Sequence, residues 1–133
     1  AGWKQIPSTS SMRLLTFQIG EQTELTVILL GGNGGGLRAN LDRWRSQMGQ
    51  GPLQDEEFAA LGRIEVFGKQ APLLELRGKF SDAMTSRAFD DAAFLGVVAE
   101  EPEGAWFFKL TGPHAEAQAH RQEFLDFCAS LRR

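Results

Sequence analysis

The segment Glu24 to Leu30, with the sequence ELTVILL, constrains the fold more than any other stretch of the chain. Apolar side chains occupy both alternating sets of positions in this strand-like run, with Leu25, Val27 and Leu29 in one set and Ile28 and Leu30 beside Thr26 in the other. A strand with one solvent-exposed face alternates apolar and polar residues, whereas a strand covered on both faces does not. We therefore expect a sheet with helices on two sides.

Short connections typical of hairpins join the strand-like runs in consecutive pairs. About six such runs are recognisable, at residues 12–19 and 24–30, 63–68 and 73–80, and 93–101 and 104–112. The second pair is joined across the turn KQAP, which contains Pro72. Residues 81–92 have no sustained period and are rich in Ser, Asp and Ala, so we predict a loop there.

Two long stretches repeat apolar residues with helical spacing. The first helix has a stripe at i, i+4, i+7 and i+11 and is ended by Gly49; the stripe is Leu37, Leu41, Trp44 and Met48. A short helical segment is predicted between Asp55 and Leu61. The second long helix has Pro113 in its first turn and the inner stripe Ala117, Phe124, Phe127, Cys128 and Leu131.

The resulting order of two strands, a helix, four strands and a helix has no regular βαβ alternation. It predicts one α+β domain over residues 1–133, built as a twisted, mainly antiparallel sheet of about six strands with helices on both faces, which is an αβα sandwich. Ten Phe and three Trp supply an aromatic-rich core for a chain of this length.

Composition and spacing argue against several classes of function. The net charge of −3 argues against a general affinity for nucleic acid, and no window approaches the roughly 18 apolar residues of a membrane span. The single Cys128 leaves no disulfide or CxxC motif, and His114 and His120 lack metal-binding spacing. The acidic clusters lack the order of a calcium loop and are interpreted as solvated surface. The sequence predicts no catalytic set, no metal site and no cofactor.

The glycine-rich segment Gly31–Gly36, which runs straight into a predicted helix, is the first candidate site. A strand, a glycine turn and a helix N-terminus together offer unpaired N–H groups and a favourable dipole to an anion. The Walker pattern is not met, because Leu37 and Arg38 follow Gly36, and the dinucleotide pattern is met only loosely, as Gly34-x-Gly36-x-x-Ala39. The sequence therefore favours a flexible turn and leaves a phosphate or nucleotide site as the alternative.

The helix after this loop carries several arginines beside the core residue Trp44. Arg38 and Arg45 share one flank with Asp42 between them, which is expected to neutralise them in part. Asn40 and Gln47 lie on the opposite flank and could hydrogen-bond to a neighbouring loop. Most such helix faces are solvated or structural, yet the loop and this helix offer the most adaptable polar surface. The nominated binding residues are Asn33, Gly34, Gly35, Gly36, Arg38, Asn40, Arg43 and Arg45.

Two stretches of the chain resemble a group of uncharacterised bacterial proteins that are often predicted to be exported or lipid-anchored. They are GGLRANLDRWRSQMGQGPL, and WFFKLTGP followed by a helix ending FLDFCASL. The strand and helix order is also similar to the PsbP-type fold of extrinsic photosystem subunits, most of which are accessory or binding proteins. The resemblance implies an αβα sandwich and an extracytoplasmic location, and it carries no catalytic residues.

These observations lead to a hypothesis of a non-enzymatic accessory or binding domain of an exported bacterial protein, with a protein as its partner. The alternative is a small-molecule-binding protein or enzyme that holds a phosphate or nucleotide at Gly31–Gly36. The chain starts with Ala1 and not Met, which fits a mature form whose leader has been removed. A lipid anchor outside these residues and the oligomeric state stay open.

Overall fold

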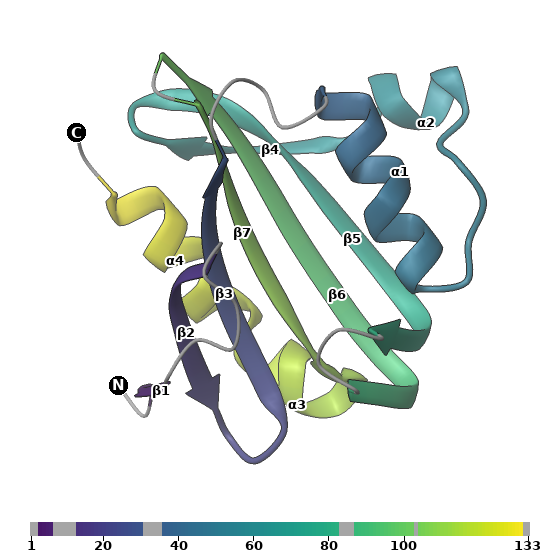
Figure 1. Ribbon diagram of the computed structural model, residues 1–133, viewed down its shortest axis with the longest axis vertical. Coiled ribbons are helices and arrows are strands. Elements are labelled where there is room, and N and C mark those ends of the chain that lie inside the picture. Colours follow the sequence, from purple (N-terminus) through teal and green to yellow (C-terminus); the bar gives the residue numbers. More distant parts are fainter. Residues whose placement is uncertain (1–2, 7–12, 31–35, 83–86, 103, 132–133) are drawn as a thin grey trace.

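The computed structural model describes residues 3–6, 13–30, 36–82, 87–102 and 104–131. Within them the chain forms one seven-stranded sheet in the order β1-β2-β3-β7-β6-β5-β4, and every neighbouring pair is antiparallel (Figure 1). The strands are β1 Trp3–Ile6, β2 Arg13–Ile19, β3 Thr23–Leu30, β4 Gly62–Val66, β5 Lys69–Asp82, β6 Arg87–Glu101 and β7 Gly104–Pro113. The predicted α+β class and antiparallel sheet are confirmed, and β1 is an additional edge strand.

The helices are few and short. They are α1 Leu37–Gln47, α2 Asp55–Ala59, α3 His114–Ala119 and α4 Arg121–Ser130. The predicted stripe on α1 is confirmed, because Leu41, Trp44 and Met48 are all buried in one cluster with side chains of the sheet. The acidic residues of α2 lie in its first turn, where their negative charge interacts favourably with the positive end of the helix dipole.

Side chains of the two central strands divide between the two faces of the sheet. Leu95 of β6 and Phe108 of β7 belong to the cluster that contains Phe124 of α4. Their chain neighbours Phe94 and Phe107 point the opposite way and contact Trp44 of α1, with ring centroids 5.3 and 6.0 Å from that of the indole. Successive residues of a strand face opposite sides of the sheet, so these clusters form two separate cores.

The helical cover is less even than the predicted sandwich. The helices α3 and α4 both pack on the face of Leu95 and Phe108. On the other face, α1 covers parts of β5, β6 and β7. The long antiparallel strands, more than the helices, dominate the architecture.

The turn between β4 and β5 lies earlier than predicted. Val66 pairs with Lys69, and the two residues between them, Phe67 and Gly68, have φ values of 55° and 78°. Two consecutive positive φ values define the tight hairpin turn that matches the twist of the flanking strands. Pro72, which we predicted in the turn, is a buried residue of β5 paired with Arg63. The predicted position was wrong because the positive φ at Gly68, and not the presence of Pro72, determines where this hairpin turns.

The prediction of a loop over residues 81–92 was also wrong where the structure describes it. β5 continues to Asp82 and β6 begins at Arg87, so Ser, Asp and Ala in this stretch lie in strands. The aromatic pair Phe80 and Phe89, which stack with centroids 6.1 Å apart, holds this end of the hairpin together. Residues 83–86 lie outside the described part of the chain.

The predicted C-terminal helix is divided, and one acidic residue is more buried than expected. β7 runs through Pro113, which is the N-cap of α3, and His120 separates α3 from α4. At the other end of β7, the Glu101 side chain is only 4% exposed and lies 3.4 Å from the Lys69 ammonium. Glu101 is therefore not a solvated hairpin-tip residue as predicted.

Candidate binding groove beside strand β5

The nominated glycine loop is described only at its end. Asn33, Gly34 and Gly35 fall within residues 31–35, outside the described residues, so the phosphate cradle stays a prediction. Gly36 is the N-cap of α1 and has φ of 100°, as expected for a residue that turns a strand into a helix.

The nominated residues Asn40 and Arg43 stabilise the start of α1 from within. Asn40 is buried, and its Nδ2 donates a hydrogen bond to the Gly36 carbonyl over 2.7 Å. Its Oδ1 accepts a hydrogen bond from Nη2 of Arg43. The Asn40 side chain therefore adds a second hydrogen bond to the N-cap carbonyl, which also accepts the Asn40 backbone N–H, and Arg43 holds the Asn40 amide in that orientation.

Arg38 and Arg45 attach α1 to the segment that follows it. Arg38 donates from Nη2 to the Leu53 carbonyl over 2.7 Å, lies 3.1 Å from Asp55 Oδ1, and its guanidinium carbon sits 4.9 Å from the centre of the Phe58 ring. Arg45 donates from Nε to the Gly51 carbonyl over 2.6 Å. Both side chains are thus held by the 51–58 segment.

Asp42 does not neutralise these arginines as predicted. Its Oδ1 accepts a hydrogen bond from the Leu53 N–H over 2.9 Å, and the ion pairs of Arg38 and Arg45 are formed with Asp55 and Glu57. The i+3 and i+4 spacing placed Asp42 on the correct flank, but the loop after α1 offers a backbone donor that the helix pattern does not reveal.

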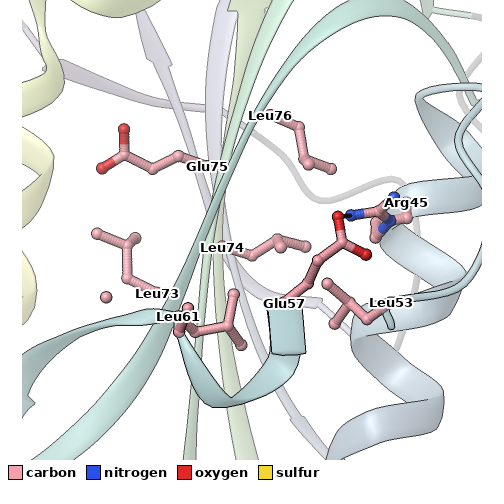
Figure 2. Close-up of a pocket in the computed structure, with 10 residues that line it drawn as sticks. Arg45, Leu53, Glu57, Leu61, Leu73, Leu74, Glu75 and Leu76 are labelled. Atoms are coloured by element: carbon pink, nitrogen blue, oxygen red, sulfur yellow. Dashed lines mark hydrogen bonds and ion pairs between the residues drawn. The ribbon is translucent and has the colours of Figure 1, made fainter. Parts of the chain in front are cut away.

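A groove of about 300 Å³ opens between α1, α2 and β5 (Figure 2). Arg45 and Glu57 are the charged side chains that face it, whereas the Glu75 side chain points away from them and pairs with Arg121 of α4. The lining is mainly aliphatic and consists of Arg45, Leu53, Glu57, Ala60, Leu61, Gly62, Leu73, Leu74, Glu75 and Leu76. Of the nominated residues that the structure describes, Arg45 is the one that lines this groove. A concave site with an apolar floor and a few charged groups is the usual form of a ligand site.

The groove lies where β5 loses its neighbour. β4 pairs with β5 only from Lys69 to Leu73, and no other described strand continues this pairing, although β5 extends to Asp82. Farther along the same edge, Gln50 donates from Nε2 to the Arg77 carbonyl over 3.4 Å. Backbone groups of residues two positions apart in a strand point the same way. The N–H and C=O of Glu75, which lies between Leu73 and Arg77, therefore point toward the groove. The open edge therefore runs from Leu74 to Leu76.

Arg45 and Glu57 form the charged wall of the groove. Arg45 is the more enclosed partner, with 14% of its side chain exposed against 47% for Glu57, and their Nη1 and Oε2 atoms are 3.5 Å apart. The other carboxylate oxygen of Glu57 accepts a hydrogen bond from the Gln54 N–H over 2.8 Å, which closes the capping box of α2. This ion pair is at the distance limit of a hydrogen bond and contributes little attraction.

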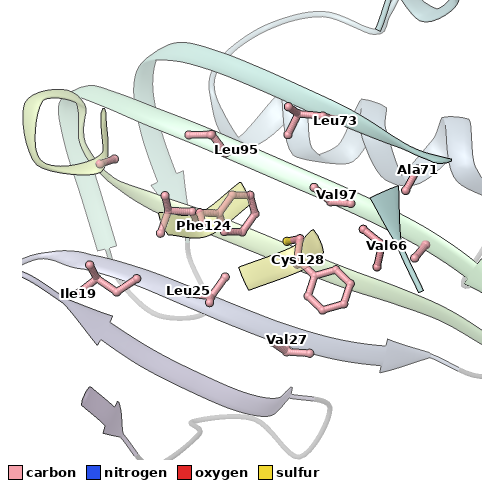
Figure 3. Packing of buried hydrophobic residues seen from close by; sticks show 14 of the residues in the cluster. Ile19, Leu25, Val27, Val66, Ala71, Leu73, Leu95, Val97, Phe124 and Cys128 are labelled. Atoms are coloured by element: carbon pink, nitrogen blue, oxygen red, sulfur yellow. The ribbon is translucent and has the colours of Figure 1, made fainter. Parts of the chain in front are cut away.

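The ionisable residues of the described groove lining are Arg45, Glu57 and Glu75. The lining includes no histidine, serine or cysteine among the described residues. Cys128, on the opposite face of the sheet, lies among buried side chains that include Phe124 and Val97, and this burial raises the pKa of its thiol to about 12 (Figure 3). His120 is engaged by Glu123, whose Oε1 lies 2.6 Å from the imidazole Nδ1.

The described residues form neither a metal-binding cluster nor a membrane-spanning helix. No group of three or more His, Cys, Asp or Glu side chains there is arranged to hold a metal ion. None of the helices in the described part of the chain has the length and apolar character that crossing a bilayer requires.

Comparisons with known proteins gave no match. Neither models of protein families, nor curated proteins, nor solved structures matched the chain.

Proposed function

We propose that this protein is a non-enzymatic binding domain that captures an extended segment of a protein partner in the groove between α1, α2 and β5. The observation that carries the proposal is the coincidence of an open strand edge with an apolar groove, at Leu74 to Leu76. An extended peptide that adds to a sheet edge gains hydrogen bonds from its backbone and specificity from pockets for its side chains. The groove offers both kinds of contact.

The composition of the groove favours binding over chemistry. The side chains of Leu53 and Leu74 are buried and form the bottom of the groove. Those of Leu61 and Leu76 are partly exposed at its sides. Aliphatic surface of this kind favours an apolar side chain, with roughly 25 cal/mol gained per Å² removed from water. Apart from the Arg45 guanidinium, a phosphate or sugar would find few side-chain hydrogen-bond donors in the described lining.

The resemblance noted in the sequence agrees with this role. Accessory and binding proteins predominate in the PsbP-type fold, and the similar bacterial group is often exported. We extend the proposal to an accessory domain with a PsbP-like αβα arrangement that acts outside the cytoplasm. Spheroplasting the source organism and locating the chain with an antibody would test the location; recovery with the cytoplasmic fraction would refute it.

The proposal is tested by peptide selection and mapping. Short random peptides are displayed on phage in two libraries, one fused through the N-terminus and one through the C-terminus, and both are selected on the folded protein. Enriched peptides are synthesised and titrated into isotope-labelled protein while backbone amide shifts are followed. Shifts centred on Leu73 to Leu76 and on Leu61 are expected. Peptides that bind only elsewhere, or no enrichment at all, would refute the groove as the binding site.

A matched pair of variants adds a second test. Ala60 lines the groove and Ala59 does not, although both are exposed at the end of α2. Ala60→Trp should fill the groove and abolish binding of the selected peptides, whereas Ala59→Trp should leave their affinity unchanged. Equal effects of the two substitutions would refute the proposal.

A further inference from the structure

The open edge of β5 is closed at both of its ends. On one side Gly62 of β4 pairs with Leu73, and on the other side Gln50 contacts the Arg77 carbonyl. The stretch between these contacts, Leu74 to Leu76, is only about 10 Å long at the rise of a β-strand. A strand that passed through would have to displace β4 or the segment around Gln50. The end of a polypeptide chain can enter without displacing either.

The charge on the groove wall distinguishes the two ends of a polypeptide. Nε of Arg45 is held by the Gly51 carbonyl, its Nη1 is only loosely engaged by Glu57, and its Nη2 makes no hydrogen bond within the described part of the chain. The guanidinium is thus fixed in place and has donors to spare. Arginine binds carboxylates through two parallel N–H···O hydrogen bonds, and such bonds are about twice as strong as neutral ones.

The ion pair between Glu57 and Arg45 can be broken without disturbing α2. Its Oε1 is held by the Gln54 N–H, so Glu57 keeps its role in the capping box of α2 when Oε2 leaves Arg45. Its side chain is about half exposed, and the carboxylate can turn toward water at small cost. An incoming carboxylate therefore competes with a weak, partly solvated partner.

We propose that the groove recognises the free C-terminus of a partner chain: the terminal carboxylate replaces Glu57 on Arg45, the preceding backbone pairs with Glu75, and an apolar side chain lies among Leu61, Leu74 and Leu76. This inference rests on the proposed function and names its ligand. Backbone pairing supplies affinity that depends little on sequence, and the carboxylate and the apolar side chain supply selectivity.

The experiment compares two displayed libraries of short random peptides, one with a free C-terminus and one in which a Gly-Ser block follows the same random residues. The free-ended library alone should enrich groove-binding peptides. An enriched peptide synthesised as its C-terminal amide should bind roughly tenfold to a hundredfold more weakly than the acid. Equal binding of the acid and the amide in the groove would overturn this inference and leave the proposed function standing. Failure of both libraries would overturn both.

Variants of the two wall residues give an independent readout. Arg45→Gln should weaken the acid peptide to the level of the amide, with Arg38→Gln as the matched control, because Arg38 holds the same segment but does not line the groove. Glu57→Gln should tighten the acid peptide and leave the amide unchanged, since Gln retains the capping box but not the competing charge. If Glu57→Gln changes the acid and the amide alike, the exchange of carboxylates on Arg45 is wrong.

Discussion

The indole of Trp44 lies against the backbone of Gly96. A Cβ atom built on Gly96 would come within 2.2 Å of Cζ3 and within 2.5 Å of Cε3 of that ring. Only a residue without a side chain leaves room for this contact, which seats α1 on β6. The position of α1, and with it one wall of the groove, depends on this approach.

Gly96→Ala should therefore destabilise the protein by about 1 to 3 kcal/mol, the usual range for overpacking a core. Urea unfolding followed by tryptophan fluorescence measures the free energy of unfolding. Gly62→Ala is the matched control, because a Cβ at this strand position meets nothing within 4 Å. Equal losses in the two variants would contradict the role of Gly96.

A second contact, between α3 and the β2–β3 turn, predicts a dependence of stability on pH. Glu116 accepts hydrogen bonds from the Glu21 N–H over 2.9 Å, the Gln22 N–H over 2.8 Å and the Thr23 hydroxyl over 2.6 Å. Partial burial raises the pKa of Glu116, but the hydrogen bonds from Thr23 and from the backbone of the turn outweigh it and hold the pKa below its ordinary value.

A carboxyl group whose pKa is lowered by folding stabilises the folded state above its unfolded pKa, and this stability is lost as the pH falls through the folded pKa. Glu116→Gln should lower the free energy of unfolding at pH 7 by about 1 to 3 kcal/mol. The variant should also lose less stability than the parent between neutral and acid pH. Urea unfolding at several pH values measures both effects, with Asp90→Asn as an exposed control. Parallel pH profiles for parent and Glu116→Gln would contradict the prediction.

The sequence predicted those elements whose signal is local. The stripe that includes Leu41 and Trp44 identified α1 and its buried face, because a helical period is repeated within a few turns. The strand Glu24 to Leu30 was recognised from apolar residues in both alternating sets. Other assignments depended on pairing across the sheet. The composition around Pro72 and in residues 81–92 suggested a turn and a loop, but the described residues there lie in paired strands. Strand pairing outweighed the local preference of these residues.

The groove was largely invisible in the sequence. Arg45 was nominated, but for its nearness to the glycine loop and not for its contact with Glu57. The run LLEL was predicted as part of a strand, and nothing in its pattern indicated that Leu74 and Leu76 line a groove. A groove forms because β4 begins only at Gly62, opposite Leu73, whereas β5 continues to Asp82. The boundaries of strands are what sequence patterns define least well.

An unsatisfied polar atom on α1 offers a stabilising substitution. Oε1 of Gln47 is buried and has no hydrogen-bond partner among the described residues, although the sequence suggested that Gln47 would bond to a neighbouring loop. A buried acceptor without a partner costs about 1 to 3 kcal/mol. Gln47→Met, which keeps the side chain's length and removes the polar atoms, should raise the melting temperature by a few degrees. Thermal unfolding measures this gain, and the exposed control Gln122→Met should show none. A melting temperature of Gln47→Met at or below that of the parent would contradict the prediction.

The reactivity of Cys128 reports directly on the packing of α4 against the sheet. Burial raises the pKa of this thiol to about 12, and the thiolate is the reactive form, so the folded protein should react very slowly with a disulfide reagent at pH 8. In urea the thiol regains its ordinary pKa and should react within the mixing time of a manual assay. Because Cys128 is the single cysteine, the absorbance of the released thiolate reports this site alone. Rapid labelling of the folded protein would mean that α4 detaches readily, and a core built on Phe124 and Cys128 would then be wrong.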